Sequence, residues 1–288
     1  MGRTSFARSV AIYLLIALVL AIFLIPIYTM IVMSFKGPND VIQQPLLPFG
    51  GMTLDNYRTV LFGEQLPGAA LVSGSGVSFG RALLNSLVVS VGSTVVALVA
   101  GVPAAYVLAR RRFRGRRQLA TFILSTRFAP PLAVLLPFYT LFTALHLVDT
   151  QLALIIVYIT MNLSMVVWMM MGFIREVPRD LEEAAMVDGS TRFGAFRRVT
   201  LPLVAGGLAA TAIFVMFLAW NEFLIAVILT NNNAVTAPVA ALAYIRYMYV
   251  AWGPLTAAGT IIAVPVLLFA LVFQQRLVRG LTAGAIHG

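Results

Sequence analysis

The sequence contains no cysteine and only two histidines among its 288 residues. The absence of cysteine excludes disulfide bonds, thiolate nucleophiles and cysteine-ligated metal ions. The two histidines, His146 and His287, do not lie near a cluster of carboxylates along the chain, so we expect no histidine-based metal site, and we assign no metal ligands to this chain. The chain also lacks a G-x-x-x-x-G-K-[ST] phosphate loop, so it carries no nucleotide site of that type.

Charge is scarce as well, because only 10% of the residues are charged whereas 60% are hydrophobic. A soluble domain carries about 25% charged residues. The mean hydropathy of +0.95 is therefore typical of a polytopic membrane protein of the all-α class. Six segments reach the roughly 20 apolar residues that a membrane helix needs. We expect one transmembrane domain over residues 1–288, with spans at about 10–33, 83–109, 118–144, 152–174, 203–229 and 256–276.

The basic residues are distributed unevenly between the two sides that these spans define. With the N-terminus in the cytoplasm, the inner segments contain fifteen of the twenty basic residues, as the positive-inside rule predicts. Both termini are then cytoplasmic. The net charge of +10 follows from this topology, so no nucleic-acid partner is needed to explain it. The inner basic residues are Arg3, Arg8, Arg110, Arg111, Arg112, Arg114, Arg116, Arg117, Arg175, Arg179, Arg192, Arg197, Arg198, Arg276 and Arg279. The run Arg110–Arg117 is interpreted as a topology anchor that faces anionic lipid.

The same topology makes 34–82 a long outer, periplasmic loop, in which Leu54–Phe62 is suited to a short interfacial helix. On the inner side, the loop 175–202 precedes the fifth span. Pro178 suits the first turn of a helix, and Gly189 suits its C-terminal cap, so a short helix is predicted at about 178–188. A second short helix should begin near Ser190 or Thr191 and end before Pro202, which would open span five.

Two small residues, Ala184 and Ala185, make the first of these helices narrow, and Glu183 and Asp188 flank them with negative charge. A narrow helix with acidic flanks suits insertion into a groove on a partner protein. An amphipathic connector that lies on the lipid surface would have similar features. The residue pattern by itself leaves both interpretations open.

A longer pattern in this loop resembles the EAA loop of bacterial ATP-binding-cassette importer permeases. The matching residues are Glu183, Ala184, Ala185, Asp188, Gly189, Phe196, Leu201 and Pro202. The tail Leu277–Ala285 also resembles that of the carbohydrate branch, whose members are similar to the smaller maltose-system permease. The resemblance extends over nearly the whole chain, including six spans, the long first outer loop and the position of the EAA loop.

This resemblance implies a mechanism and a set of partners. Two homologous permeases would form the pathway in a bacterial or archaeal cytoplasmic membrane, above two ATPase subunits that hold ATP and Mg²⁺. An extracytoplasmic solute-binding protein would deliver the carbohydrate. The EAA helix would dock in a cleft of one ATPase, so that Glu183 and its neighbours transmit force and perform no chemistry.

Polar residues within the spans are candidates for the substrate pathway, because ionisable groups at membrane depth are costly. Hydrogen-bonding groups beside aromatic rings suit a sugar or polyol. The same groups would also serve to satisfy polar atoms across helix interfaces. The candidates are Trp220, Asn221, Glu222 (in the middle of span five), Asn162, Tyr158 and Arg127. Arg127 either pairs with Glu222 or extends toward the inner surface, and Pro130, Pro131 and Pro137 are expected to kink span three.

The polar outer loop Thr230–Pro238 resembles the loop that, in maltose-type subunits, reaches into the solute-binding protein. Its candidate contact residues are Asn231, Asn232, Asn233 and Thr236. A plain solvated turn is the alternative. For the whole chain, a secondary transporter or channel that works alone is the second hypothesis, and a membrane scaffold is the third. The carbohydrate itself, a disaccharide, polyol or related glycoside, is not identified by these residues.

Overall fold

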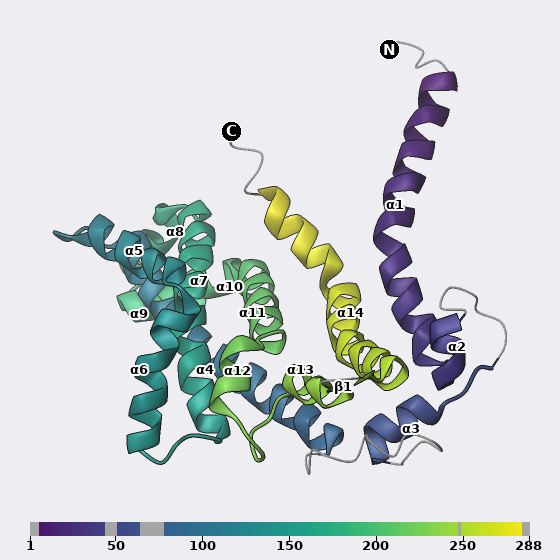
Figure 1. The fold of residues 1–288 in the computed structure, drawn as a ribbon. Helices are drawn as coiled ribbons and strands as arrows, with labels where there is room; N and C mark the ends of the chain where they lie inside the picture. The colour runs from purple at the N-terminus through teal and green to yellow at the C-terminus, as the bar shows by residue number, and fades with distance from the viewer. Residues whose placement is uncertain (1–5, 44–50, 64–77, 247–248, 284–288) are drawn as a thin grey trace. The chain divides into compact units, whose positions relative to one another are not determined.

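The computed structural model describes residues 6–43, 51–63, 78–246 and 249–283, and most of them are helical (Figure 1). The strands in this part of the chain form one two-stranded hairpin, in agreement with the all-α class predicted from composition. The chain divides into two compact units, Met1–Gly80 with Ala240–Val264, and Arg81–Val239 with Pro265–Gly288. The sequence features that lie outside the described residues or side chains are Arg3, Arg246, Arg276, Arg279, His287 and most of the tail Leu277–Ala285.

The first unit begins with α1 (Phe6–Ser34), a helix that is apolar on every side. Its most apolar window has a mean hydropathy of 3.1, and none of that window is buried within the chain. A helix that is hydrophobic all round and remains exposed suits a lipid environment. Two short helices follow in the outer loop, α2 (Pro38–Gln43) and α3 (Asp55–Phe62). α3 lies where the sequence predicts a short helix.

Asn56 of α3 holds this unit together. Its Nδ2 donates to the backbone oxygens of Ser34, at 2.9 Å, and Lys36, at 2.8 Å. The backbone at Gly253, in α14 (Trp252–Ala283), approaches so closely that a Cβ there would lie 2.5 Å from Asn56 Oδ1. Glycine at 253 is therefore required for this packing. α14 is preceded by η3 (Ala241–Tyr244) and a hairpin of β1 (Ile245–Arg246) and β2 (Tyr249–Val250), and it continues into the second unit.

The second unit contains the features that the sequence analysis associates with function. Its long helices are α4, α7 and α11, and shorter helices connect or interrupt them. In chain order they are α4 (Phe79–Arg110), α5 (Arg116–Ser125), η1 (Thr126–Phe128), α6 (Pro131–Ala144), α7 (Gln151–Glu176), α8 (Arg179–Val187), α9 (Arg192–Ala195), the π-helical η2 (Phe196–Thr200), α10 (Leu201–Leu203), α11 (Ala205–Trp220), α12 (Leu224–Leu229) and α13 (Ala237–Ala240).

Four described helices are long and apolar enough to cross a membrane, namely α1, α4, α7 and α14, and two bent pairs bring the number to as many as six. The third segment bends by 89° between Phe128 and Pro131. The bend follows from Pro130 and Pro131, because proline lacks an N–H and disfavours a helical conformation in the residue before it. The kink expected in this span is therefore present.

The fifth segment differs from the sequence prediction in two ways. The helix that begins at Arg192 does not end before Pro202 but continues to Leu203, and a bend of 75° separates it from α11. The predicted span 203–229 is also interrupted between Trp220 and Leu224, so that Glu222 lies in a break between α11 and α12. The prediction that Glu222 lies within a continuous helix is therefore wrong.

Two clusters of buried residues form the core of the second unit, and α7 contributes to both. Close packing depends on small residues at the helix interfaces, as is common for membrane helices. A Cβ at Gly101 of α4 would lie 2.6 Å from Val166 of α7, and a Cβ at Gly207 of α11 would lie 2.4 Å from the ring of Phe173. α7 therefore positions both α4 and α11, which carry the two ends of the candidate site.

Candidate functional site

Helix α8 forms where the sequence predicts it. Pro178 occupies the N-cap position, and Asp180 and Glu182 lie in the first turn, where acidic side chains interact favourably with the helix dipole. Gly189 has a φ of 89°, a left-handed conformation that ends the helix and favours glycine. Thr191 then caps the next helix, α9, by accepting a hydrogen bond from Gly194 N at 3.1 Å. The loop is thus a structured pair of helices.

One acidic residue of α8, Glu182, is buried and fastens the helix to the end of α4. Its Oε1 accepts hydrogen bonds from Arg110 Nε and Thr200 Oγ1, both at 2.7 Å, and its Oε2 accepts one from Tyr106 O–H at 2.9 Å. Arg110 Nη2 also donates to the backbone oxygen of Val177 at 2.8 Å. The Glu182 carboxylate therefore joins α8, α4 and the π-helical segment η2.

Several other residues of α8 are exposed. Glu183 and Ala184 are among them, Val187 is 87% exposed, and Asp188, which follows the helix, is exposed too. Phe193, at the start of α9, is 68% exposed and adds a second large apolar group. Solvent-exposed apolar residues beside carboxylates are typical of a surface that binds another protein. We call Glu183, Ala184, Val187, Asp188 and Phe193 the α8 face.

Three other residues of the proposed coupling set lie elsewhere. Phe196 is buried, and its ring centroid lies 4.6 Å from that of Tyr106. Ala185 is half-buried, and its backbone oxygen accepts a hydrogen bond from Ser190 N at 3.0 Å. Pro202 is exposed within α10. Phe196 therefore packs the loop against α4. The sequence motif did not single out Val187 and Phe193, which are large exposed apolar residues of this loop.

A cavity of about 370 Å³ lies beneath α8, between it and the last turns of α4. Tyr106, Glu182 and Phe196 contribute to its lining, together with the arginines Arg111, Arg179 and Arg192. The contact between α8 and α4 is therefore made chiefly by the hydrogen bonds of Glu182.

At the other end of the second unit, Glu222 occupies the break in the fifth segment. Its carboxylate accepts hydrogen bonds from Ile225 N, at 3.0 Å, and Ala226 N, at 3.2 Å, and so caps the start of α12. Tyr158 O–H of α7 donates to its Oε2 at 2.9 Å. The carboxylate thus replaces the backbone acceptors that the break removes, which explains how the helix restarts at this point.

The other residues proposed for the substrate pathway do not form one cluster with Glu222. Trp220 and Asn162 are buried, whereas Asn221 is exposed and donates to Phe217 O at 2.9 Å. Trp220 lines an apolar cavity of about 160 Å³. Tyr158 and Glu222 are joined directly, through their hydrogen bond.

Arg127 lies at the mouth of a different cavity, of about 300 Å³, at the bend of the third segment. The remaining lining is mostly apolar and includes Phe138, Met161 and Ile225. In the part of the chain that the structure describes, the two ion pairs are Arg58–Asp55 and Arg110–Glu182. The suggested pairing of Arg127 with Glu222 is therefore absent, since Tyr158 and the backbone of α12 occupy the carboxylate.

The outer loop Thr230–Pro238 is held by a carboxylate that the sequence analysis did not single out. Asp149, between α6 and α7, accepts hydrogen bonds from four successive backbone N–H groups, those of Asn231, Asn232, Asn233 and Ala234, at 3.0–3.2 Å. Asn233 Nδ2 donates to it as well, at 3.0 Å. A row of backbone N–H groups that converge on one anion is a strong and specific arrangement.

This arrangement changes the acidity of Asp149. Partial burial alone would raise the pKa of its carboxyl group, but the backbone donors of Asn231, Asn233, Ala234 and Asn232 outweigh burial and lower the pKa below its ordinary value of 3.8. Asp149 has a φ of 62°, a conformation that Asp and Asn tolerate better than most residues. The carboxylate is therefore charged at neutral pH, when it holds the loop.

Asn85 of α4 supports the same loop from inside. Its Nδ2 donates to the backbone oxygens of Asn233 and Val235, both at 2.9 Å, and its Oδ1 accepts from Gln151 Nε2 at 2.6 Å. Asn231, Asn232 and Asn233 remain exposed, whereas Thr236 is buried. The three asparagines thus form the accessible part of the loop, and Thr236 belongs to its support. Isolated polar residues within or beside apolar segments, such as Asn85, were the signal available in the sequence.

No group of three His, Asp or Glu side chains suited to a metal ion occurs among the described residues.

Comparisons with known proteins agree on one family. The model of the family described as binding-protein-dependent transport system inner membrane component matches residues 97–283. The chain is 36% identical over 274 residues to the trehalose transport system permease protein SugB of Mycobacterium tuberculosis, covering 94% of this chain and 95% of that protein. It also resembles a solved bacterial ABC transporter involved in the import of the acidic polysaccharide alginate, with a TM-score of 0.75, 22% identity, and coverage of 96% of this chain and 98% of that chain.

A further solved structure is of a bacterial alginate ABC transporter in complex with an alginate pentasaccharide-bound periplasmic protein. It matches with a TM-score of 0.64 and 18% identity, over 93% of each chain. At these identities the two structures show the fold alone, and they share it with this chain over nearly its whole length.

Proposed function

The chain belongs to the family of binding-protein-dependent transport system inner membrane components, and from this membership we propose how its parts work in an importer. It is a permease subunit of an ATP-binding-cassette transporter, with the type I importer permease fold, and its role is transport rather than catalysis. In our proposal it pairs with a second homologous permease, and one of two ATPase subunits docks on the α8 face. ATP and Mg²⁺ are bound by those ATPase subunits.

The single observation that carries the proposal is the attachment of α8 to α4 through Glu182. A docking helix transmits force only if it is fixed to the elements that must move. Hydrogen bonds from Tyr106, Arg110 and Thr200 to the Glu182 carboxylate fix the first turn of α8 to α4 and to η2. When the ATPase dimer closes and displaces α8, α4 and η2 move with it. The long helix α4 then carries the displacement into the membrane.

The proposed orientation places the α8 face in the cytoplasm and Asn231–Asn233 on the outer side. It rests on the excess of arginine in the loops at the α8 end. On the outer side, the accessible asparagines would contact the solute-binding protein. Their rigid support by Asp149 favours this role over a plain solvated turn, because a preorganised loop loses little conformational entropy on binding.

We propose a carbohydrate as the substrate, because SugB is named for trehalose and the alginate transporter imports a polysaccharide. The residues placed nearest the proposed pathway suit such a ligand. Glu222 and Tyr158 supply a fixed polar pair, and Arg127 lies at the mouth of the cavity beside Phe138. Aromatic and apolar walls with a few polar groups fit the C–H faces and hydroxyls of a sugar.

Uptake by the assembled transporter tests the proposal. The complex, with its ATPases, partner permease and binding protein, is reconstituted in liposomes, and trehalose uptake is measured with and without ATP. Ala184→Trp, on the α8 face, should abolish co-purification of the ATPase subunits and ATP-driven uptake. Ala144→Trp, an exposed alanine at the end of α6, is the matched control and should affect neither. Uptake by the purified chain alone, without an ATPase, would instead favour a stand-alone transporter.

A further inference from the structure

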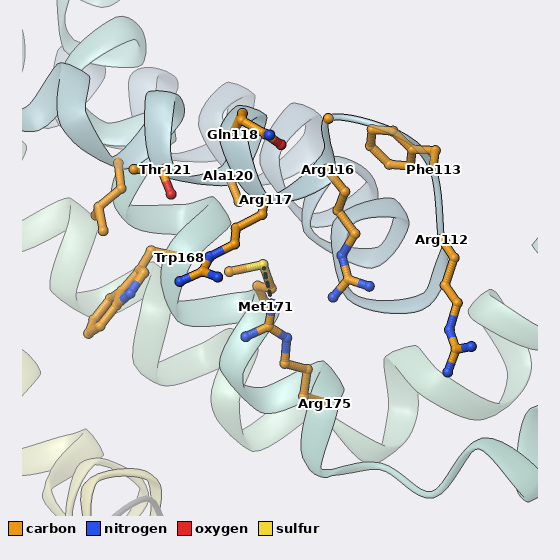
Figure 2. A pocket seen from close by; sticks show the side chains of 12 residues that line it. Arg112, Phe113, Arg116, Arg117, Gln118, Ala120, Thr121, Trp168, Met171 and Arg175 are labelled. Carbon is orange, nitrogen blue, oxygen red and sulfur yellow. Dashed lines mark hydrogen bonds between the residues drawn. The ribbon is translucent and has the colours of Figure 1, made fainter.

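A fourth cavity, larger than the three above, lies away from the α8 face and from Glu222. It measures about 650 Å³ and lies between α5, the turn before it and the end of α7. Four arginines contribute to its lining, namely Arg112 from the turn, Arg116 and Arg117 from the first turn of α5, and Arg175 from the last turn of α7. Figure 2 shows Arg116 and Arg117 reaching from α5 toward Arg175, with Arg112 on the other side.

The positive charge of this cavity is not neutralised within the described part of the chain. No acidic side chain lines it, and neither of the two ion pairs of the described residues involves these arginines. The hydrogen bonds of their guanidinium groups go to neutral acceptors, from Arg116 Nη1 to Arg111 O at 3.4 Å and from Arg175 Nη2 to Met171 Sδ at 3.3 Å. Four guanidinium groups around one cavity repel each other, and an anion that they share relieves this repulsion.

The start of α5 adds to the positive potential. This helix of ten residues begins after Gly115, which has a φ of 86°, and its first turn contains no acidic residue. No side chain caps its N-terminus. The N-terminus of a helix carries a partial positive charge, so it favours the same anion that the arginines attract.

The side of the cavity farthest from Arg112 is apolar. Trp168, Met171 and Arg175 follow one face of α7, at spacings of three and four residues, and Leu124 of α5 lies opposite. Trp168 is 50% exposed, and Figure 2 shows its ring beside Thr121 at the end away from Arg112. Tryptophan concentrates at membrane interfaces, where one part of its ring system is apolar and its N–H is polar. The cavity therefore combines a basic end with an apolar end at the boundary of α7.

We propose that this cavity binds the phosphate headgroup of an anionic phospholipid from the cytoplasmic leaflet, with the arginines on the phosphate and Trp168 beside the acyl chains. The inference rests on the orientation given under the proposed function. The apolar end favours a lipid over a free phosphate, which has no acyl chain to place there. It also favours a lipid over an acidic segment of an ATPase, because Leu124 and Trp168 in the lining are apolar groups that such a segment would leave without a matching partner. Basic cavities between membrane helices on the cytoplasmic side are suited to lipid headgroups.

Retention of phosphatidylglycerol by the purified transporter tests this site. The full complex is extracted in detergent with phosphatidylglycerol and phosphatidylcholine in equal amounts, and the lipid that remains bound is counted by native mass spectrometry. Arg117→Gln with Arg175→Gln should lower the retained phosphatidylglycerol by about thirtyfold, since each arginine near an anionic lipid contributes on the order of 1 kcal/mol and the two losses add. Arg114→Gln with Arg198→Gln removes the same charge from two exposed arginines outside this lining and should change retention little.

Several results would overturn the site. Equal loss in the pocket and control variants would mean that only overall charge matters. Equal retention of phosphatidylcholine would exclude recognition of an anion. Displacement of the lipid by inorganic phosphate at the same concentration would assign the cavity to free phosphate. Unchanged lipid with loss of the ATPase subunits would assign it to a protein contact.

The variant Arg117→Lys with Arg175→Lys checks that the chain folds, because it keeps the charge and should retain part of the lipid. Lipid retention is measured independently of transport. A complex that does not transport trehalose but still retains phosphatidylglycerol therefore supports this site. A complex that imports trehalose without retaining the lipid overturns this site and leaves the proposed function intact.

Discussion

Arg110 donates from Nε to Glu182 Oε1 across 2.7 Å, and both side chains are only 8% exposed. This pair joins the last turn of α4 to the first turn of α8, and two candidate membrane-spanning segments lie between them in the sequence. Thr200 and Tyr106 complete the hydrogen bonding of the carboxylate, so neither charge of the pair is left unsatisfied. In the proposed importer, this contact transmits the displacement of the docking helix α8 to α4 and so to the membrane domain.

Glu182→Gln should strongly destabilise the permease and uncouple transport. The substitution leaves the charge of Arg110 buried without its counter-charge, which costs about 3–5 kcal/mol. The expected results are a lower midpoint of thermal unfolding of the purified complex, faster proteolysis within 178–204, and ATP hydrolysis that no longer drives uptake.

Glu183→Gln is the matched control, because Glu183 is the neighbouring acid and is exposed. It should leave the unfolding midpoint and the proteolysis rate near those of the wild type. Replacing both Arg110 and Glu182 by methionine should destabilise less than the sum of the single replacements. If the double variant shows simple additivity, the two side chains are not energetically coupled.

Asp149→Asn should loosen the outer loop without altering the backbone that carries it, because Asn also tolerates the left-handed conformation of this position. The neutral amide is a weaker acceptor for the N–H groups of Asn231–Ala234. We expect faster hydrogen exchange at these amides and weaker stimulation of transport by the binding protein. Asp55→Asn is the control, since Asp55 forms only an exposed ion pair with Arg58 at 3.8 Å.

The pH dependence of this loop follows from the same carboxylate. The pKa of Asp149 is lower in the folded chain than its ordinary value of 3.8, so its stabilisation is complete above that value. It is lost only as the pH falls through the lower, folded-state pKa. Hydrogen exchange at 231–234, corrected for intrinsic rates, should therefore show an ordered loop from neutral pH down to about pH 4. Loss of order between pH 7 and pH 5 would mean that another group controls the loop.

Glu222→Ala should lower the rate of uptake while the complex still assembles. The substitution removes the acceptor for Ile225 N, Ala226 N and Tyr158 O–H, and losing a helix cap costs about 0.5–2 kcal/mol. Tyr158→Phe should have a smaller effect, because the backbone cap of α12 remains. A change in KM for the sugar would indicate contact with substrate, whereas a change in maximal rate alone would indicate a structural role. Unchanged uptake would remove Glu222 from the pathway.

The orientation can be tested directly, because the chain has no native cysteine. Single cysteines at Arg114 and Asn232, both exposed, should react with a membrane-impermeant maleimide from opposite sides. In intact cells we expect labelling of Asn232→Cys, and in inside-out vesicles labelling of Arg114→Cys. The reverse pattern would invert the orientation and exclude the α8 face from the cytoplasm.

Composition and local pattern were sufficient for the class of protein and for several helices. Scarce charge and long apolar runs require helices in a membrane, because a lipid-embedded backbone must satisfy its own hydrogen bonds. The prolines and glycine around α8 act through their own backbones, and the side chain of the threonine before α9 caps a residue three positions later, so these effects can be read from the local sequence. The bend of the third segment is likewise encoded by adjacent prolines. The motif that contains Glu183 lies in the loop where the predicted short helix α8 forms.

The partners of polar side chains were decided only by the tertiary structure. Glu182 and Glu183 are adjacent acids in the same helix, and the sequence does not distinguish the buried one from the exposed one. Burial depends on which face of α8 packs against α4, some seventy residues away. Asp149 meets Asn231–Ala234, and Tyr158 meets Glu222, for the same reason. These contacts join residues far apart in the chain, and their geometry exists only once α7 has packed between α4 and α11.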